Sequence, residues 1–360
     1  MASTDADHVR EQVPTAIPDA IASSAPEPPP GEPDSIGARL KKPQTLVSFG
    51  LAIAIFVFFF LRLDIDFDEV WAIVKGANPL LFLGALVLYY AGMLARGVRW
   101  RWMLETANVE GRNGAKLPGD RELTEILLLS WFVNCIVPAR LGDAYRSWLL
   151  KRQTGASFSA SFGTILAERI VDLLVLVGMM GAAGLVAFHG KLPGEARHTV
   201  IVAGALVGIG IIGLGILWIG RGRVEGRLPH RWQGQFARLN NALFACLRRP
   251  GRLVGMSVAI WISDGVRLLM VSAALGQALP LSTAIFVALM SSMLTTLPIT
   301  PAGLGVVEAA MIVVLELVGI GTAMATSIAL MDRVITYWSL IVFGLILYLV
   351  RMRAELRSQR

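Results

Sequence analysis

Two short stretches, Pro138-Ala139-Arg140-Leu141-Gly142 and Pro301-Ala302-Gly303-Leu304-Gly305, have nearly the same sequence. Each follows a hydrophobic run that is too short to cross a bilayer comfortably, for which about 20 residues are needed. Each stretch predicts an interrupted helix, because proline lacks the backbone N–H donor and glycine tolerates unusual backbone angles. The long apolar segment after each break carries an ionisable pair, Glu168-Arg169 in one case and Asp332-Arg333 in the other.

A third pair of blocks keeps the same order along the chain. Gly97-Val98-Arg99 lies upstream of the first break, and Gly265-Val266-Arg267 lies upstream of the second. The separation between the two copies is nearly the same for all three blocks. This shared order predicts an internal duplication, with repeat halves at about 79–190 and 253–350. Duplicated broken helices in membrane proteins usually surround a substrate path.

Composition places the chain in a membrane. Hydrophobic residues make up 55% of the sequence and charged residues 16%, and several apolar runs reach or approach the length of a spanning helix. The predicted spans are Thr45–Leu61, Leu80–Leu94, Phe162–Phe188, Val200–Ile219, Leu253–Leu275 and Thr322–Val350. The net charge of +7 does not indicate nucleic-acid binding, because the arginines gather in the loops that flank these runs.

The loop charges predict the topology. Residues 1–43 are polar and rich in proline, which predicts a disordered tail. The positive-inside rule places this tail and the basic residues 351–360 in the cytoplasm, with the membrane domain at 44–350 between them. The segments Leu123–Leu150 and Leu281–Gly319 are each expected to enter and leave the membrane on one side, as re-entrant hairpins.

The expected fold class follows from this topology. We predict an all-α polytopic membrane protein with six full spans and two re-entrant hairpins. The two hairpins enter from opposite faces, so the repeat is inverted. A protein with eight complete spans, in which the hairpins are opened into crossings of the membrane, is the alternative.

Charged residues inside the apolar runs need internal partners or a hydrated cavity, because an unpaired charge at bilayer depth costs about 3 kcal/mol. Their spacing predicts pairs on one helical face between Arg169 and Asp172 and between Asp264 and Arg267. These pairs have two interpretations. They either hold helices together, or they supply arginines that bind an anionic lipid headgroup.

The predicted substrate path combines the two breaks with these charged helices. Its residues are Asn134, Pro138, Arg140, Gly142, Arg146, Glu168, Arg169, Asp172, Pro301, Gly303, Gly305, Glu308, Asp332 and Arg333. Interrupted helices leave backbone groups free to meet a polar ligand; kinked helices that are packed and self-bonded are the alternative. The first break is the more basic, since Arg140 and Arg146 stand where the second has Gly303 and Ala309. We expect this first break to be the headgroup site, reached from the cytoplasm.

Other motifs carry less information. Cys135, Cys246 and the four histidines lack metal-ligand spacing, so no metal, cofactor or catalytic residue is expected. The sequence has no glycine-rich phosphate loop of the kind that hydrolyses ATP. Trp100 and Trp102, which stand beside Arg99 and Arg101, predict an anchor at the membrane surface.

The chain resembles the lysylphosphatidylglycerol synthase transmembrane-region family, whose members are also called flippase-like membrane proteins. The resemblance covers about residues 45–350 and rests on Arg96–Trp100, Asn134–Arg146, Glu168–Asp172, Pro298–Glu308 and Asp332–Tyr337. It implies a protein of the bacterial cytoplasmic membrane. The implied partners are membrane lipids, namely an anionic phospholipid, a hopanoid or a lipid-linked precursor, together with enzymes of envelope biosynthesis.

The resemblance also implies a function in lipid translocation. The chain ends ten residues after its last predicted span, so no soluble aminoacyl-transferase domain is expected. We therefore predict a lipid translocase that is not an enzyme. The alternatives are a membrane-embedded glycosyl or lipid transferase, a non-enzymatic subunit of a cell-envelope lipid pathway, and a scaffold without transport.

Overall fold

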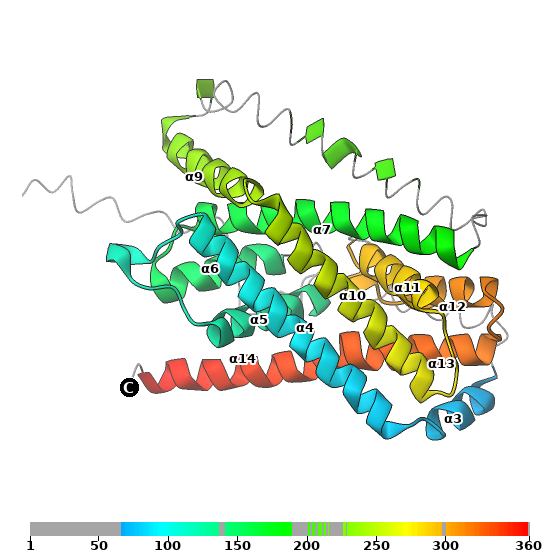
Figure 1. Ribbon diagram of the computed structural model, residues 1–360. Helices are drawn as coiled ribbons and strands as arrows, with labels where there is room; N and C mark the ends of the chain where they lie inside the picture. The colour runs from blue at the N-terminus through cyan, green and yellow to red at the C-terminus, as the bar shows by residue number, and fades with distance from the viewer. Residues whose placement is uncertain are drawn as a thin grey trace, which may run out of the picture.

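The structure is a computed structural model that describes residues 66–136, 141–188, 229–296 and 300–358, with scattered positions between 201 and 227. Within these residues every regular element is helical (Figure 1). The helices are α3 (Phe67–Lys75), α4 (Pro79–Thr106), α5 (Asp120–Ile136), α6 (Gly142–Thr154), α7 (Phe158–Ala187), α9 (His230–Leu247), α10 (Pro250–Ala274), α11 (Leu281–Leu294), α12 (Val306–Leu317), α13 (Thr322–Arg333) and α14 (Ser339–Ser358). Short 3-10 turns form at Arg112–Gly114 and Pro301–Gly303, and a π-helical segment forms at Val334–Trp338.

Four helical stretches in the described ranges are long and apolar enough to cross a membrane. They are Pro79–Thr106, Phe158–Ala187, Pro250–Ala274 and Thr322–Arg351. These stretches match four of the six predicted spans. The predicted span Thr45–Leu61 and the tail at 1–43 lie outside the described residues, as does most of Val200–Ile219. The chain is therefore a multi-pass helical membrane protein.

Helix α4 begins at residues that favour a helix start. Asn78 caps α4, because its Oδ1 accepts hydrogen bonds from the backbone N–H groups of Leu80 and Leu81, at 2.9 and 3.3 Å. Pro79 then occupies the first helical position, where a missing N–H costs nothing. The prediction that this span ends near Leu94 was wrong, since α4 continues to Thr106. The extra turns carry Arg96 and Arg99, which are buried in the protein rather than exposed at its surface.

Helices α4 and α10 run side by side in opposite directions (Figure 1). The N–H of Asn78, at the start of α4, donates to the carbonyl of Ala274, at the end of α10, over 2.7 Å. At the other end the Arg252 guanidinium lies 5.0 Å from the ring centre of Trp102. The two helices therefore stay in contact along their whole length.

Each member of this pair also carries a glycine that faces the next helix along the chain. A Cβ atom on Gly97 would collide with Thr124 of α5, and one on Gly265 would collide with Ile285 of α11. Glycine therefore lets α4 approach α5, and α10 approach α11, more closely than any other residue would.

The four shorter helices form two hairpins. Helices α5 and α6 have 17 and 13 residues, and α11 and α12 have 14 and 12, so each falls short of a bilayer. In the first hairpin Ser130 of α5 is bonded to the start of α6, because its Oγ donates to the Gly142 carbonyl over 2.8 Å. In the second hairpin the backbone turns through Ala302 and Gly303, whose φ angles are 47° and 71°.

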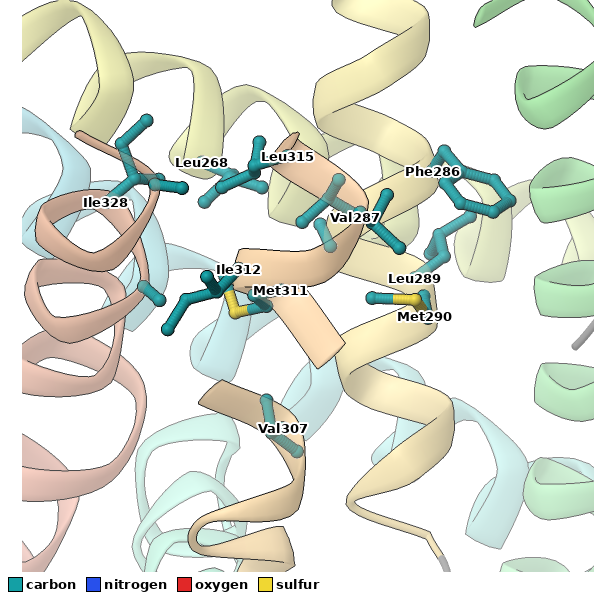
Figure 2. Close-up of a cluster of buried hydrophobic side chains, with 14 of the residues drawn as sticks. Leu268, Phe286, Val287, Leu289, Met290, Val307, Met311, Ile312, Leu315 and Ile328 are labelled. Carbon is teal, nitrogen blue, oxygen red and sulfur yellow. The ribbon is translucent and has the colours of Figure 1, made fainter. Parts of the chain in front are cut away.

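Buried apolar side chains hold the second hairpin against its neighbours. Leu268 of α10, Val287 and Leu289 of α11, Met311 of α12 and Ile328 of α13 belong to one cluster (Figure 2). The outward faces of the long helices are apolar as well, as with Leu80 and Val87 of α4 and Val342 and Ile346 of α14. Such an exterior suits contact with lipid chains, so the polar chemistry is confined to the inside.

Substitution of either packed glycine by alanine should destabilise the protein. Gly97→Ala and Gly265→Ala each place a methyl group inside a helix crossing, and overpacking of this kind costs about 1–3 kcal/mol. The measurement is the midpoint of thermal unfolding in detergent. Gly255→Ala, on the same helix α10 but with no neighbouring atom near its Cβ, is the control and should leave the midpoint unchanged or slightly higher, because alanine favours a helix more than glycine does. Equal midpoints for all three variants would contradict the close approach.

Candidate functional site

A cavity of about 250 Å³ lies between the two hairpins, among α4, α5, α7, α10, α11 and α13. Four arginines and three carboxylates line it, a concentration of charge that is rare at this depth in an apolar protein. They are Arg96, Arg169, Arg267, Arg333, Glu168, Asp172 and Asp264. Hydroxyl side chains at the end of α11 form part of the remaining wall.

The Arg99 guanidinium organises the charges of the first half. It lies 2.8 Å from Glu168 and 2.6 Å from Asp172, both on α7, and only 1% of its side chain is exposed. Glu168 is shared with Arg146 of α6, at 3.0 Å. The Arg146 guanidinium in turn lies 3.8 Å from the ring centre of Trp100. Helices α4, α6 and α7 are therefore joined by one buried ion network.

A second network joins α4, α10 and α13. Arg267 of α10 forms an ion pair with Asp332 of α13. Asp264, one turn earlier on α10, lies 2.7 Å from Arg96 of α4. The side chains of all four are at least nine-tenths buried, so each charge depends on its partner rather than on water.

Two further pairs tie each hairpin to the long helix that follows it. Arg169 of α7 donates from Nε and Nη2 to the Asp143 carboxylate of α6, at 3.0 and 2.7 Å. Arg333 donates to Glu308 of α12 over 2.7 Å and to the Ala302 carbonyl over 3.0 Å. The two pairs differ in exposure, with side chains 30% and 18% exposed in the first and 5% and 2% exposed in the second.

The charges of these networks balance among the described residues. The cations are Arg96, Arg99, Arg146, Arg169, Arg267 and Arg333, and the anions are Asp143, Glu168, Asp172, Asp264, Glu308 and Asp332. Such a balance is what allows so many charges to lie in an apolar setting. A ligand with a charge of its own must therefore share or replace an existing pair.

The structure brings most of the predicted path residues to this cavity or directly behind it. Asn134, Glu168, Arg169, Asp172 and Arg333 line the cavity. Arg146, Glu308 and Asp332 lie behind the wall, each paired with a residue that lines it.

The remaining predicted residues belong to the turns. Gly142 donates its N–H to Asn134 Oδ1 over 2.8 Å, and Gly305 donates its N–H to Glu308 Oε2 over 2.7 Å. Pro301 and Gly303 form the 3-10 turn of the second hairpin. Pro138 and Arg140 lie outside the described residues.

Two sequence-based predictions need correction, and a third is confirmed. Arg169 and Asp172 do not form the predicted pair; Arg169 pairs with Asp143 and Asp172 with Arg99, each on another helix. The predicted pair of Asp264 and Arg267 is present at 4.0 Å, and each of the two also has a closer partner, Arg96 and Asp332 respectively. Trp100 is fully buried against Arg146 and is not a surface anchor.

The site residues that the prediction omitted all pair with charges on other helices. They are Arg96, Arg99, Asp143, Asp264 and Arg267. The signal that identifies two of them was present, since Arg99 and Arg267 end the repeated Gly-Val-Arg blocks. Arg99 was omitted because the sequence placed it at the membrane surface, beside Trp100. Helix α4 is longer than predicted, so Arg99 lies within the helix.

These features define a multi-pass membrane protein with a charge-lined cavity between helical hairpins. The chain belongs to the lysylphosphatidylglycerol synthase TM region family, whose sequence model matches residues 47–344.

Several relatives share most of this region. A UPF0104 membrane protein of Methanocaldococcus jannaschii is 32% identical over 233 residues, which cover 64% of this chain and 98% of that protein. A UPF0104 membrane protein of Pyrococcus horikoshii is 23% identical over 308 residues, covering 77% and 89% of the two chains. The glycosyltransferase AglD of Haloferax volcanii is 25% identical over 341 residues, which cover 84% of this chain but only 53% of that protein.

The buried pairs should be strongly coupled. Removing one charge with Asp332→Asn leaves Arg267 buried without its partner, which should cost about 3–5 kcal/mol. Combining it with Arg267→Gln should cost less than the sum of the single changes. The measurement is a double-mutant cycle on unfolding in detergent. Arg101 and Glu105, an exposed pair on α4, provide the control, with a coupling below about 1 kcal/mol. Equal coupling in the two cycles would contradict the burial argument.

Proposed function

We propose that this protein moves a lipid between the leaflets of the bacterial cytoplasmic membrane, with the headgroup in the cavity and the acyl chains in the bilayer. The observation that carries the proposal is the cavity itself, which places arginines beside interrupted helices inside an apolar exterior. Guanidinium groups suit the oxygens of a lipid phosphate, because their fixed donors match its geometry. Anionic phospholipids, hopanoids and lipid-linked precursors are the proposed cargo.

We propose that the transport unit is an inverted repeat. Contacts at matching positions of the two proposed halves support this. Arg99 pairs with Glu168 in the first half, and their counterparts Arg267 and Asp332 pair in the second. Arg96 and Asp264 stand at matching positions and pair with each other, as residues beside a two-fold axis would.

The packing of whole helices supports the same proposal. Helix α3, just before α4, packs on α13, and α9, just before α10, packs on α7. The helix that precedes each proposed half therefore contacts a helix of the other half. The proposed halves stay at about 79–190 and 253–350, within a membrane domain at 44–350.

The proposed topology has six spans, two re-entrant hairpins and cytoplasmic termini. Cysteine labelling should test it in intact cells. Asp68→Cys and Gln277→Cys should react with a membrane-impermeant maleimide from outside, whereas Lys116→Cys and Lys151→Cys should react only after the membrane is opened. The two native cysteines are buried and give a low background. Labelling of Lys116→Cys and Lys151→Cys from opposite sides would mean that the first hairpin crosses the membrane, as in the eight-span alternative.

The ion pairs suggest how a headgroup moves. A phosphate that enters the cavity competes with Asp143 for Arg169 and with Glu308 for Arg333. Each displaced carboxylate then needs a proton or another cation before the next step. We propose that movement is driven by the lipid gradient or by a coupled ion, with the more exposed Arg169 pair as the cytoplasmic entry.

Purified protein in liposomes that contain fluorescent lipids should test transport. Dithionite should bleach more than half of the label if lipid is moved, and only the outer leaflet in empty vesicles. Arg169→Gln and Arg333→Gln should each reduce the rate to that of empty vesicles in protein that still purifies as a monodisperse peak, although Arg333→Gln leaves Glu308 without its partner and should lower the unfolding midpoint. Arg101→Gln, an exposed change, is the control and should transport normally. Wild-type rates equal to empty vesicles for phosphatidylglycerol, aminoacylated and prenyl-phosphate lipids would refute the proposal.

A second candidate is a membrane-embedded transferase, or a subunit that assists one in a cell-envelope lipid pathway. The similarity to a protein named glycosyltransferase AglD favours it, although the matched region is about half of that protein. The same liposomes, supplied with a prenyl-phosphate lipid and a labelled sugar nucleotide, distinguish the two. Label transferred to lipid would favour the transferase.

A further inference from the structure

We infer that Tyr89 of α4 positions Arg333 for the proposed transport, by holding a π-helical turn in the helix that carries this arginine. The inference rests on the proposed function, in which Arg333 is one of two arginines that meet the headgroup. Tyr89 lines the cavity, and only 4% of the residue is exposed. Its hydroxyl donates to a backbone carbonyl, that of Thr336, over 3.2 Å.

The carbonyl that Tyr89 reaches belongs to an irregular part of a long helix. Helix α13, the π-helical segment Val334–Trp338 and α14 follow one another without a break (Figure 1). The Ser339 N–H donates to the Val334 carbonyl, five residues earlier, whereas in an α-helix it would donate to a carbonyl four residues earlier. Turns of this kind are rare and frequently lie at functional sites. This one begins directly after Arg333.

Side-chain hydroxyls bond to the backbone of the π-helical segment. Ser339 Oγ donates over 2.5 Å to the Ile335 carbonyl, which the Ser339 N–H would meet in an α-helix. Tyr89 Oη donates to the next carbonyl, that of Thr336. Tyr90 Oη lies 2.9 Å from Ser339 Oγ. Two successive tyrosines of α4 therefore support the irregular turn, and Tyr89 does so by direct contact with its backbone.

The proposed first half contains an equivalent contact. Ser257 of α10 has the same place in its half as Tyr89, since each stands ten residues before the arginine of its Gly-Val-Arg block. Ser257 Oγ donates to Asp172 Oδ1 over 2.8 Å. Asp172 and Thr336 also have matching places, four residues after the acidic member of each ionisable pair. Each half therefore sends a hydroxyl to the same position in the other half.

The two contacts differ in what they fix. Helix α7 is α-helical throughout, and Ser257 bonds to its Asp172 side chain. The second half has Thr336 at this place, and Thr336 Oγ donates back to the Asp332 carbonyl over 3.0 Å. Tyr89 bonds instead to the Thr336 main chain. The contact that fixes a side chain in the first half therefore fixes the backbone in the second, about one turn after the ionisable pair.

The π-helical turn sets the direction of Asp332 and Arg333. One extra residue in a turn rotates the helix before it by about 100° relative to the helix after it. Since α14 packs on α5, a return to regular α-helix would rotate the end of α13. Such a rotation would direct Arg333 away from Glu308 and Asp332 away from Arg267, the partners that they have in this structure. Tyr89 therefore acts on the cavity through Arg333 and is a positioning residue.

Tyr89→Phe tests this inference, because it removes the hydroxyl and keeps the ring. The first measurement is the coupling between Arg333 and Glu308, from a double-mutant cycle of Arg333→Gln and Glu308→Gln on unfolding in detergent. The cycle is run in the wild-type protein and in the Tyr89→Phe protein. We expect Tyr89→Phe to remove most of the coupling, because Arg333 is then no longer directed at Glu308.

Controls separate positioning from a general loss of stability. A hydrogen bond with only a structural role would lower the stability of all four proteins of the cycle equally and leave the coupling unchanged. The cycle of Arg169→Gln and Asp143→Asn, which joins the other hairpin to α7, should give the same coupling with and without Tyr89→Phe. Tyr348→Phe on α14, whose ring packs against Phe132, should leave the Arg333 coupling unchanged.

Transport of labelled phosphatidylglycerol in liposomes is the second measurement. Tyr89→Phe should slow transport roughly tenfold, the effect of one hydrogen bond, whereas Tyr348→Phe should transport at the wild-type rate.

Four outcomes decide the inference. Unchanged Arg333 coupling in the Tyr89→Phe protein would overturn it, and slower transport in the same protein would assign Tyr89 a direct contact with the headgroup. Reduced coupling with transport at the wild-type rate would also overturn it, because the direction of Arg333 would then have no effect on transport. Reduced coupling together with slower transport would support it. Reduced coupling in a protein whose wild-type form moves no lipid would support the positioning of Arg333 by Tyr89 and refute the proposed translocase.

Discussion

The mutual neutralisation of buried charges is the constraint on which this structure depends. Arg99, Glu168 and Arg146 join three helices at a depth where an unpaired ion would cost a large part of the stability of the fold. Arg267 with Asp332, and Arg96 with Asp264, do the same for the other long helices. Apolar packing alone does not fix the relative positions of helices whose lipid-facing and protein-facing surfaces are equally apolar. The ion networks fix these relative positions, because a guanidinium group donates hydrogen bonds only to partners that lie along its N–H directions.

The networks also explain why the cavity lies where it does. Hairpins shorter than the bilayer turn inside the protein, and the backbone groups at these turns need partners from outside their own helix. Asn134 and Glu308 satisfy some of these groups, and arginines from neighbouring helices satisfy others. What is left is a small polar volume within an apolar body, which is the setting that a lipid headgroup needs when it leaves the interface.

Much of this arrangement could be predicted from the sequence. Hydropathy located four spans that the structure contains, and the repeated Pro-Ala-x-Leu-Gly stretches located both hairpins. The charge partners could not be predicted in the same way. Spacing of three residues suggested Arg169 with Asp172, but helix packing brought Asp143 and Arg99 closer. Sequence spacing describes only neighbours on one helix, whereas a buried ion can pair with any helix that surrounds it.

The balance of six arginines against six carboxylates in the described residues has an electrical consequence. If the proposed translocase works without a coupled ion, a headgroup with no net charge would leave the interior neutral, and its passage would move no charge across the membrane. A singly anionic headgroup would make the loaded interior negative, and its passage would work with or against the membrane potential, at about 2.3 kcal/mol per 100 mV. The balance of buried ion pairs would thereby determine whether the resting voltage of a cell influences the direction of the proposed transport.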